Sequence, residues 1–300
     1  MRRNIARAMI ILSAVLWGTS FPVIRVGLMF MSPIVFLFLR FSLATLILFS
    51  ILLIRGIRLS PRRMGGLVGL AGIMNAFAYA LQFVGQKYTY ATNAALMINT
   101  SPIFTAISAH FLIEERLTKE RIGAIAITFI GAGMVILGSA TTLKLRILGD
   151  LICLLAGAIW GIYVTEAKKI RESSFDELEL LAIWFLYVAV LGGLVLPFEK
   201  IYFSMSIIAM FAVIYTAVMC TVLPFLLWYK ALRILEASTS SNYFMLEIVV
   251  SAVVEMVFIG LLVTPTMIMG AIMIIIGVYL TDYFYTKNGR EASLSTSNPG

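Results

Sequence analysis

Residues 14–21 of the chain read AVLWGTSF, and residues 157–164 read GAIWGIYV, so a Trp-Gly pair occurs in two separate apolar stretches. Trp17 and Trp160 are about half a chain length apart. A similar offset relates the apolar stretches at 91–113 and 237–262. This recurrence predicts an internal repeat.

The composition shows where such a repeat would lie. Of the 300 residues, 61% are hydrophobic and only 13% are charged, and the mean hydropathy is +1.00. A membrane span needs roughly 20 apolar residues, because the hydrocarbon layer is about 30 Å thick. A soluble domain of this length is therefore excluded, and we predict an all-α integral membrane protein. Its ten predicted transmembrane helices are 8–27, 33–54, 64–85, 91–113, 119–137, 148–167, 177–196, 205–229, 237–262 and 266–284.

Ten spans in two matched halves place five spans in each half. Because five is odd, the second copy enters the membrane in the opposite direction to the first. We predict two inverted five-helix repeats, at 1–140 and 141–286. A tail at 287–300 has too little apolar surface to order itself, so we expect it to be disordered. Many secondary transporters have inverted repeats, with the substrate site near the midplane between the copies.

The basic residues predict the orientation of the chain. Most of the 23 lysines and arginines fall in the N-terminus, in alternate loops and in the tail. Positive loops are retained on the cytoplasmic side, so we expect a multi-pass protein of the cell membrane with both termini cytoplasmic. The net charge of +8 then reflects topology. Nucleic-acid binding is not expected, because the positive residues do not form one stripe.

The sequence offers little for catalysis. His110 is the single histidine, and Cys153 and Cys220 lie in separate apolar stretches, so no metal cluster or disulfide framework is predicted. The motifs H-E-x-x-H and G-x-S-x-G and a phosphate-binding glycine loop are absent. We therefore expect no catalytic residue, no cofactor and no enzymatic activity. An integral-membrane enzyme is the weaker alternative, and a passive channel or lipid flippase of similar architecture stays open.

Three stretches resemble the EamA branch of the drug/metabolite transporter superfamily. They are AVLWGTSFPV at 14–23, FLRFSLA at 38–44 and ATNAALMINTSPIFTAISAHFLIEERLT at 91–118. Pro102 and the Glu-x-x-Thr at Glu115–Thr118 match the family pattern, whereas Gly260-Leu261 in the second half lacks the acid. The resemblance covers roughly 8–285. It implies a ten-helix bundle, a central cavity and export or exchange of small metabolites.

Polar and aromatic groups in the predicted spans indicate the candidate site. Asn75, Tyr79, Gln82 and Gln86 share one helical face. Counting about 1.5 Å per residue from the predicted helix ends places one residue of each of six spans near half depth, namely Trp17, Asn75, Thr100, Trp160, Thr216 and Glu247. Tyr79 and Tyr243 adjoin them. We predict that the substrate-binding residues are Trp17, Asn75, Tyr79, Thr100, Trp160, Thr216, Tyr243 and Glu247.

Each of these residues also has a structural interpretation. Asn75, Thr100 and Thr216 would otherwise join helices by hydrogen bonds. The two tryptophans would pack. Glu247 is the strongest candidate, because an ionisable group at this depth costs roughly 2.5–3.5 kcal/mol. Its alternative is a protonated glutamate that donates one hydrogen bond.

Two further charges lie at similar depth below the outer ends of their spans. We predict that Arg40 and Glu255 form an ion pair across the outer vestibule, either as a gate or as a structural clasp. Pro22, Pro102 and Pro224 are expected to interrupt their helices, because proline lacks a backbone donor.

The expected partners are a small-molecule substrate and the lipid bilayer. The aromatic and amide lining with one deep carboxylate predicts amino acids or small amphipathic amines as substrates. Small residues in the fifth and tenth spans allow close helix approach, and by resemblance these edge helices would mediate a homodimer. These residues are Gly131, Gly133, Gly270 and Gly277.

Overall fold

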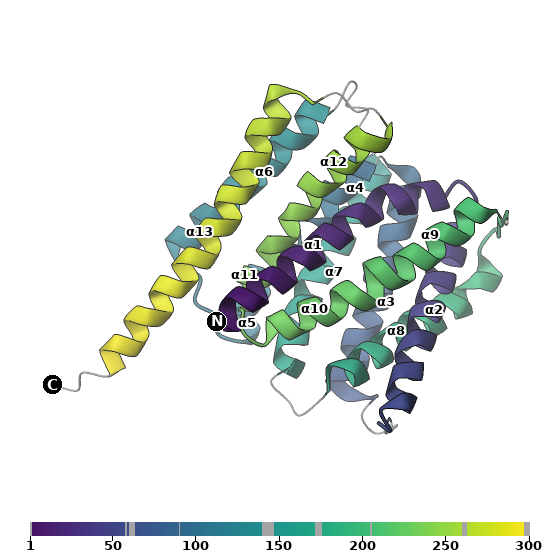
Figure 1. The fold of residues 1–300 in the computed structure, drawn as a ribbon, viewed down its shortest axis with the longest axis horizontal. Coiled ribbons are helices and arrows are strands. Elements are labelled where there is room, and N and C mark those ends of the chain that lie inside the picture. The colour runs from purple at the N-terminus through teal and green to yellow at the C-terminus, as the bar shows by residue number, and fades with distance from the viewer. Residues whose placement is uncertain are drawn as a thin grey trace.

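The computed structural model of the chain describes residues 2–57, 59, 64–89, 91–139, 147–171, 176–204, 206–259 and 263–296. Within these residues the fold is all helical, with one isolated antiparallel bridge between Met31 and Phe203 (Figure 1). The α-helices are α1 (Arg2–Gly27), α2 (Pro33–Ile54), α3 (Gly66–Tyr88), α4 (Ala91–Ile98), α5 (Ser101–Leu112), α6 (Lys119–Ser139), α7 (Ile147–Arg171), α8 (Glu177–Val195), α9 (Ile207–Ala217), α10 (Leu223–Leu232), α11 (Ala237–Asn242), α12 (Leu246–Ile259) and α13 (Pro265–Thr296). Two short 3-10 helices, η2 (Leu196–Phe198) and η4 (Tyr243–Met245), and one π-helical turn, η3 (Val218–Val222), connect some of these helices.

Nine helical stretches of the described chain are long and apolar enough to cross a membrane. The predicted all-α membrane protein is therefore confirmed, and the chain is a multi-pass membrane protein. The predicted span at 119–137 falls on α6, which is not among these nine stretches.

Helix ends follow from local sequence. At the start of α8, the Asp176 carboxylate accepts a hydrogen bond from the backbone of Leu178 (2.9 Å), and the Asp176 backbone N–H donates to Glu179 (3.4 Å). This is a capping box, which satisfies backbone donors that a helix start leaves free. The Ser206 hydroxyl likewise accepts from the backbone of Ala209 at the start of α9.

Of the three prolines that are expected to interrupt helices, two lie at helix breaks. The fourth predicted span is split at Asn99 and Thr100, and Pro102 lies in the first turn of α5. Pro224 lies in the first turn of α10, after the π-helical turn η3. The expected break at Pro22 is wrong, since α1 runs through it. A membrane helix tolerates proline because neighbouring groups can satisfy the freed backbone carbonyl.

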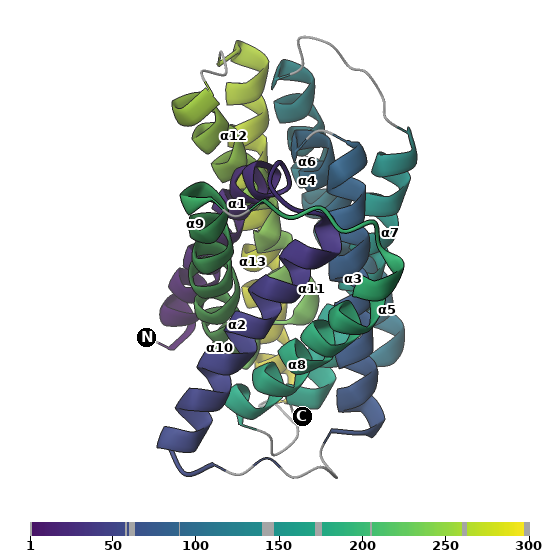
Figure 2. The same cartoon turned by 90° about the vertical axis from the view of Figure 1, so that its right-hand side faces the viewer.

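The helices form a bundle with one pair at its edge. Helix α3 packs on α7 and α8, and α1 packs on α10 and α12. Helices α6 and α13 pack mainly on each other, side by side and away from the α2–α8 end of the bundle (Figures 1 and 2).

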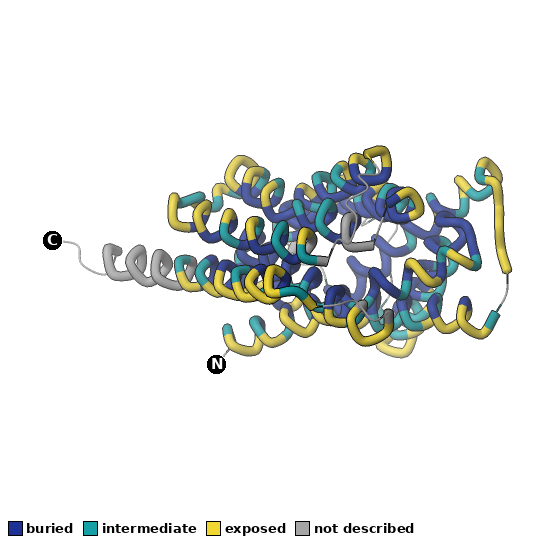
Figure 3. Tube along the Cα trace, turned by 90° about the horizontal axis from the view of Figure 1, so that it is seen from above, coloured by how far each residue is buried: buried dark blue, intermediate teal, exposed yellow. Residues whose placement is uncertain are grey.

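Burial separates an interior from an apolar periphery. Buried residues fill the centre of the bundle, and exposed ones follow its outer faces (Figure 3). Many exposed residues are large and apolar, such as Ile54, Phe198 and Ile207. Such surfaces are unfavourable in water and favourable in lipid, which agrees with a membrane-spanning chain.

Candidate functional site

A cavity of about 480 Å³ lies among the interior helices, including the space through which it opens to the outside. Its lining combines aromatic rings, hydroxyl and amide groups, one guanidinium and one carboxyl group. The lining residues are Trp17, Ser20, Phe21, Arg40, Tyr79, Gln82, Ile98, Asn99, Ser101, Trp160, Phe244 and Glu247.

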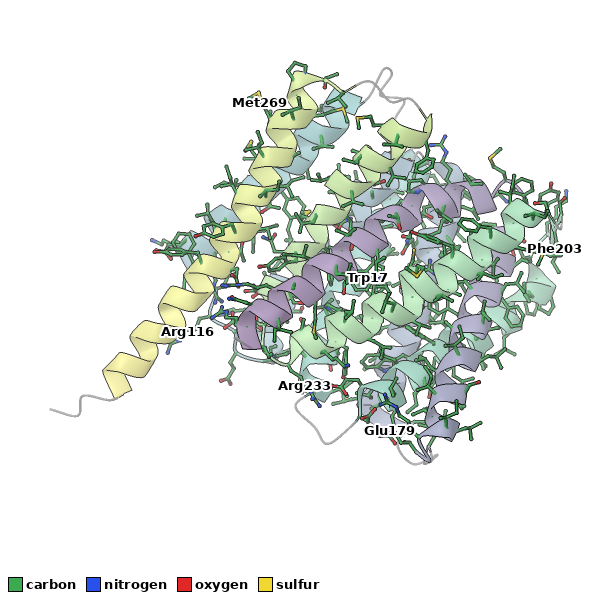
Figure 4. The ribbon with its side chains drawn as sticks, viewed as in Figure 1. Trp17, Arg116, Glu179, Phe203, Arg233 and Met269 are labelled. Carbon is green, nitrogen blue, oxygen red and sulfur yellow. The ribbon has the colours of Figure 1, made fainter. Side chains whose placement is uncertain are left out.

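Aromatic rings hold one side of this cavity. Trp17 on α1 lies near the middle of the molecule (Figure 4), with its ring 5.1 Å from Phe225 and 5.2 Å from Phe244. Tyr79 lies 5.0 Å from Trp160, and Trp160 lies 6.0 Å from Phe225. Most of these rings meet edge to face, an arrangement that rings favour and that fixes their positions. The tryptophans therefore both pack and line the cavity.

Arg40 on α2 is almost fully buried, at 1% exposure. Its Nε donates to Thr221 Oγ1 (2.7 Å), and its Nη2 donates to the carbonyl oxygen of Cys220 (2.9 Å). The guanidinium carbon lies 5.3 to 5.8 Å from the centres of the rings of Phe41, Tyr79 and Phe83, within cation–π range.

Pro224 explains why a backbone carbonyl is free to hold Arg40. In an α-helix the N–H of residue 224 would donate to the carbonyl of Cys220, four residues earlier. Proline has no N–H, and the chain makes the π-helical turn η3 at this point. The Cys220 carbonyl therefore accepts from Arg40 instead.

Glu247 lies in the first turn of α12 and is 7% exposed. The Asn99 side chain, at the break between α4 and α5, lies beside its carboxyl group. The two residues bring the broken helix and α12 to the same cavity.

The glycines of the two Trp-Gly pairs make equivalent contacts. A Cβ atom at Gly18 would lie 2.6 Å from Val250 and 2.9 Å from the carbonyl of Glu247, so α1 lies against α12. A Cβ atom at Gly161 would lie 2.5 Å from Phe104 and 2.7 Å from the carbonyl of Ser101, so α7 lies against α5. Each pair thus places a tryptophan in the cavity and its glycine against a helix of the other half.

A charged cluster holds the turn between α10 and α11. The Glu115 carboxylate accepts hydrogen bonds from the backbone N–H of Ala237 (2.6 Å) and from the backbone N–H and hydroxyl of Ser238 (3.2 and 2.7 Å). It thereby caps the start of α11. Lys168 on α7 donates to the carbonyls of Leu232 and Leu235, at the end of α10.

Two ion pairs complete this cluster. The Arg121 guanidinium lies 2.7 Å from the Glu236 carboxylate, and Arg233 lies 3.1 Å from Glu177. Burial raises the pKa of Glu236 to about 7, an effect that nearby Glu115 increases and that Arg121 opposes. Arg233 directly follows α10 and lies at the lower edge of the view in Figure 4.

A comparison with known protein families shows the family of this chain. A family model described as the EamA-like transporter family matches residues 4–137 and again residues 147–282. The chain belongs to the EamA-like transporter family. It is therefore a transporter of the drug/metabolite transporter superfamily rather than an enzyme, as the motifs at 14–23, 38–44 and 91–118 predict.

Relatives agree with this assignment. This EamA-like transporter is 28% identical over 286 residues to an uncharacterized transporter of Archaeoglobus fulgidus, covering 90% of this chain and 94% of that one. It is 28% identical to the uncharacterized transporter YyaM of Bacillus subtilis, over 87% and 88% of the two chains. It is 24% identical to a probable amino-acid metabolite efflux pump of Salmonella typhimurium, over 91% and 93%. A crystal structure at 16% identity has the same fold, with a TM-score of 0.78 over 95% of this chain and 99% of that one.

The cavity of this EamA-like transporter brings together four of the predicted substrate-binding residues. Trp17, Tyr79, Trp160 and Glu247 all line it. Arg40, expected in an outer ion pair, lines it as well.

The other four candidates are not lining residues. Asn75 is fully buried, and no described residue satisfies its amide. Thr100 donates to the carbonyl of Met97 (2.7 Å) and Thr216 to that of Ala212 (2.6 Å), so both bond within their own helical segment. Tyr243 lies beside Arg7 and Asp282 instead.

Several lining residues are not among the predicted substrate-binding residues. Asn99 and Ser101 flank the helix break before Pro102, and a run of polar residues before a membrane proline is the signal that marks them. Gln82 shares the helical face of Tyr79, which the spacing does predict. Ser20 and Phe244 carry no comparable signal.

Some expectations fall outside the described part of the chain or stay untested. The side chain of Glu255 is not among the described ones, so its pairing with Arg40 stays a prediction. Cys153 and Cys220 are buried, free thiols. Among the described residues, no cluster of histidine, cysteine or acidic residues could hold a metal ion.

Proposed function

We propose that this EamA-like transporter is a secondary transporter that moves amino acids or small amphipathic amines across the cytoplasmic membrane by alternating access, in export or exchange. The observation that carries the proposal is the interior cavity, in which aromatic rings surround one guanidinium and one carboxyl group. One relative is named as a probable amino-acid metabolite efflux pump. The sequence has no phosphate-binding glycine loop, so ion or substrate gradients would supply the energy.

We also propose that ten spans form two inverted repeats, at 1–140 and 141–286. Two observations support this architecture: the family model matches the chain twice, and the contacts of Gly18 and Gly161 are reciprocal. In each case the first helix of one half packs on a broken helix of the other half. Rocking of one half against the other would then expose the cavity to the two sides in turn.

Both termini are proposed to be cytoplasmic, including residues 287–300, for which the sequence predicts disorder although α13 continues as a helix to Thr296. The contact between the start of α1 and α13 supports this, because Arg3 and Arg7 form ion pairs with Asp282, near the end of the last apolar stretch of the chain. The two ends therefore lie on the same side of the bundle. Cysteine labelling of residues 2 and 298 in intact cells tests the orientation, and labelling of only one of them would contradict the span count.

Counterflow in proteoliposomes tests the function. Vesicles with purified protein are loaded with an unlabelled amino acid or amine, and uptake of the labelled compound is measured with and without a proton gradient. We expect uptake to be faster with internal substrate, because a carrier returns faster when loaded. A passive channel would show no such acceleration. Absence of flux for every amino acid and amine would reject the proposal.

A homodimer through α6 and α13 stays a proposal. Gly131, Gly270 and Gly277 already pack these two helices on each other within the chain, whereas a Cβ atom at Gly133 would meet open space. A dimer would therefore use the outward faces of the two helices, including Gly133. Cross-linking of a cysteine at position 133 in membranes tests this contact.

A further inference from the structure

Arg40 carries a buried charge without a carboxylate partner among the described residues. A buried ion is costly unless it is paired and all its donors are used. Aromatic faces, a hydroxyl and a carbonyl compensate part of that cost. Among the residues that the structure describes, no carboxylate forms an ion pair with the Arg40 guanidinium.

The hydrogen bonds of Arg40 also leave one nitrogen unused. Nε and Nη2 are held by Thr221 and Cys220, which fixes the plane of the guanidinium. Nη1 is buried and has no acceptor among the described residues, although the Arg40 side chain lines the cavity. An unsatisfied buried donor is unfavourable, and a bound anion would satisfy both it and the charge.

The second ionisable group of the cavity complements this one. Glu247 lines the same space from α12. Tyr79 lines the cavity together with both groups, and the centre of its ring lies 5.5 Å from the Arg40 guanidinium carbon. A guanidinium and a carboxylate in one aromatic cavity match a molecule that carries both an acid and an amine.

We propose that Arg40 binds the acid group of the substrate through Nη1 and that Glu247 binds its ammonium group. The inference rests on the proposed transport function and narrows it. The site then selects zwitterionic α-amino acids and discriminates against amines without the acid. Arg40 is thus a specificity-determining residue rather than half of an outer gate.

Matched compounds test this selection. The first set is leucine, its amide, 3-methylbutylamine and 4-methylpentanoate, and the second is the corresponding phenylalanine series. Each unlabelled compound competes with counterflow of whichever standard amino acid the wild-type protein transports fastest. We expect the amino acids to compete at least about tenfold better than their amides, the typical effect of one charge-assisted hydrogen bond.

Arg40→Gln provides the decisive variant. We expect the preference for acid over amide to fall by about tenfold or more, whereas Arg40→Lys keeps the charge and part of the preference. Arg25→Gln, an exposed position outside the cavity, is the matched control and should keep the full preference. The readout is the ratio of competition by the acid to competition by the amide within one variant. A loss of folded protein lowers the counterflow signal but leaves this ratio unchanged.

Four outcomes would overturn the inference. An equal loss for acid and amide in Arg40→Gln would assign Arg40 a structural role only. Recovery of Arg40→Glu transport by Glu255→Arg would assign Arg40 to the outer ion pair. Counterflow of amines but of no amino acid would reject the inference while the transport function stands, and absence of all flux would reject both.

Discussion

Glu236 illustrates how burial changes a single residue. It lies in the turn between α10 and α11, with its carboxylate 2.7 Å from Arg121, and its pKa is raised from an ordinary 4.5 to about 7. Burial is the main cause, and it outweighs the attraction of Arg121. The packed turn therefore binds a proton that an unfolded or opened turn would release near neutral pH.

The sign of the pH dependence follows from this raised pKa. The contribution of protonated Glu236 to the free energy of unfolding is fully present below about pH 4.5. It is lost as the pH rises towards about 7, by up to about 1.4 kcal/mol per pH unit. We expect Glu236→Gln to remove this component of the slope. Thermal unfolding of purified protein between about pH 4.5 and 8 measures it. Glu114→Gln, at an exposed site, is the control, and equal slopes for wild type and Glu236→Gln would refute the prediction.

Glu247 gives a second prediction at this scale. Glu247→Gln keeps the shape of the side chain but removes its negative charge, so binding of amine-bearing compounds should weaken by about tenfold or more. A ligand-stabilisation screen with amino acids, nucleosides and cationic drugs measures the change. If every compound that stabilises the wild type stabilises the variant equally, Glu247 does not belong to the site.

At the scale of elements, the start of α11 depends on a carboxylate from another helix. Glu115 follows α5, yet it caps α11 through three hydrogen bonds. Helix starts need such acceptors because their first backbone N–H groups have no partner within the helix. The contact joins the fourth and ninth predicted spans at their loops.

We therefore expect Glu115→Ala to destabilise the protein by about 1–3 kcal/mol, since it leaves buried donors without an acceptor. Glu115→Gln keeps one acceptor oxygen and should have a smaller effect. The unfolding temperature in detergent measures both. An unchanged temperature for Glu115→Ala would show that water replaces the cap at no cost.

The whole molecule depends on how the edge pair of helices is attached. Gly131 and Gly270 let α6 and α13 approach so closely that added Cβ atoms would lie 2.7 and 2.5 Å from backbone oxygens of the facing helix. Backbone atoms cannot move aside as a flexible side chain can. The pair must therefore separate if either glycine gains a side chain.

We expect Gly131→Ala to destabilise the fold by about 1–3 kcal/mol through overpacking. Gly133→Ala, two residues further on the same helix, meets open space and should be neutral or stabilising by up to about 1 kcal/mol. Unfolding temperatures of the two variants form a matched comparison. Equal effects would mean that helix propensity, rather than close packing, decides stability here.

Much of the fold is predictable because membrane insertion is decided within short windows of sequence. The predicted span at 33–54 coincides with α2 (Pro33–Ile54). Pro102 and Pro224 mark two breaks correctly, since the loss of a backbone donor is a local property. Pro22 does not break α1. A membrane helix continues through a proline where neighbouring groups satisfy the freed backbone carbonyl, and those neighbours come from the tertiary structure.

The candidate site is predictable only in part. The Trp-Gly pairs stand out because they recur at matched positions in the two halves, and Glu247 stands out because ionisable residues are rare in membrane spans. The place of Thr216 outside the cavity lining could not be found in this way, because depth along a helix does not give its rotation about its axis. Helix α9, which carries Thr216, is otherwise apolar except for Tyr215, so it shows no polar face that would give the rotation.

Hydropathy and family motifs are read along the chain, so they suffice to predict a helical protein that crosses a membrane several times and belongs to a transporter family. Which polar groups meet follows from how the helices pack in three dimensions. Arg40 is held by Cys220 and Thr221, some 180 positions away. Lipid is as apolar as the interior of the bundle, so hydrophobic pattern alone cannot tell a helix which neighbour to face. Close packing and buried hydrogen bonds make that choice.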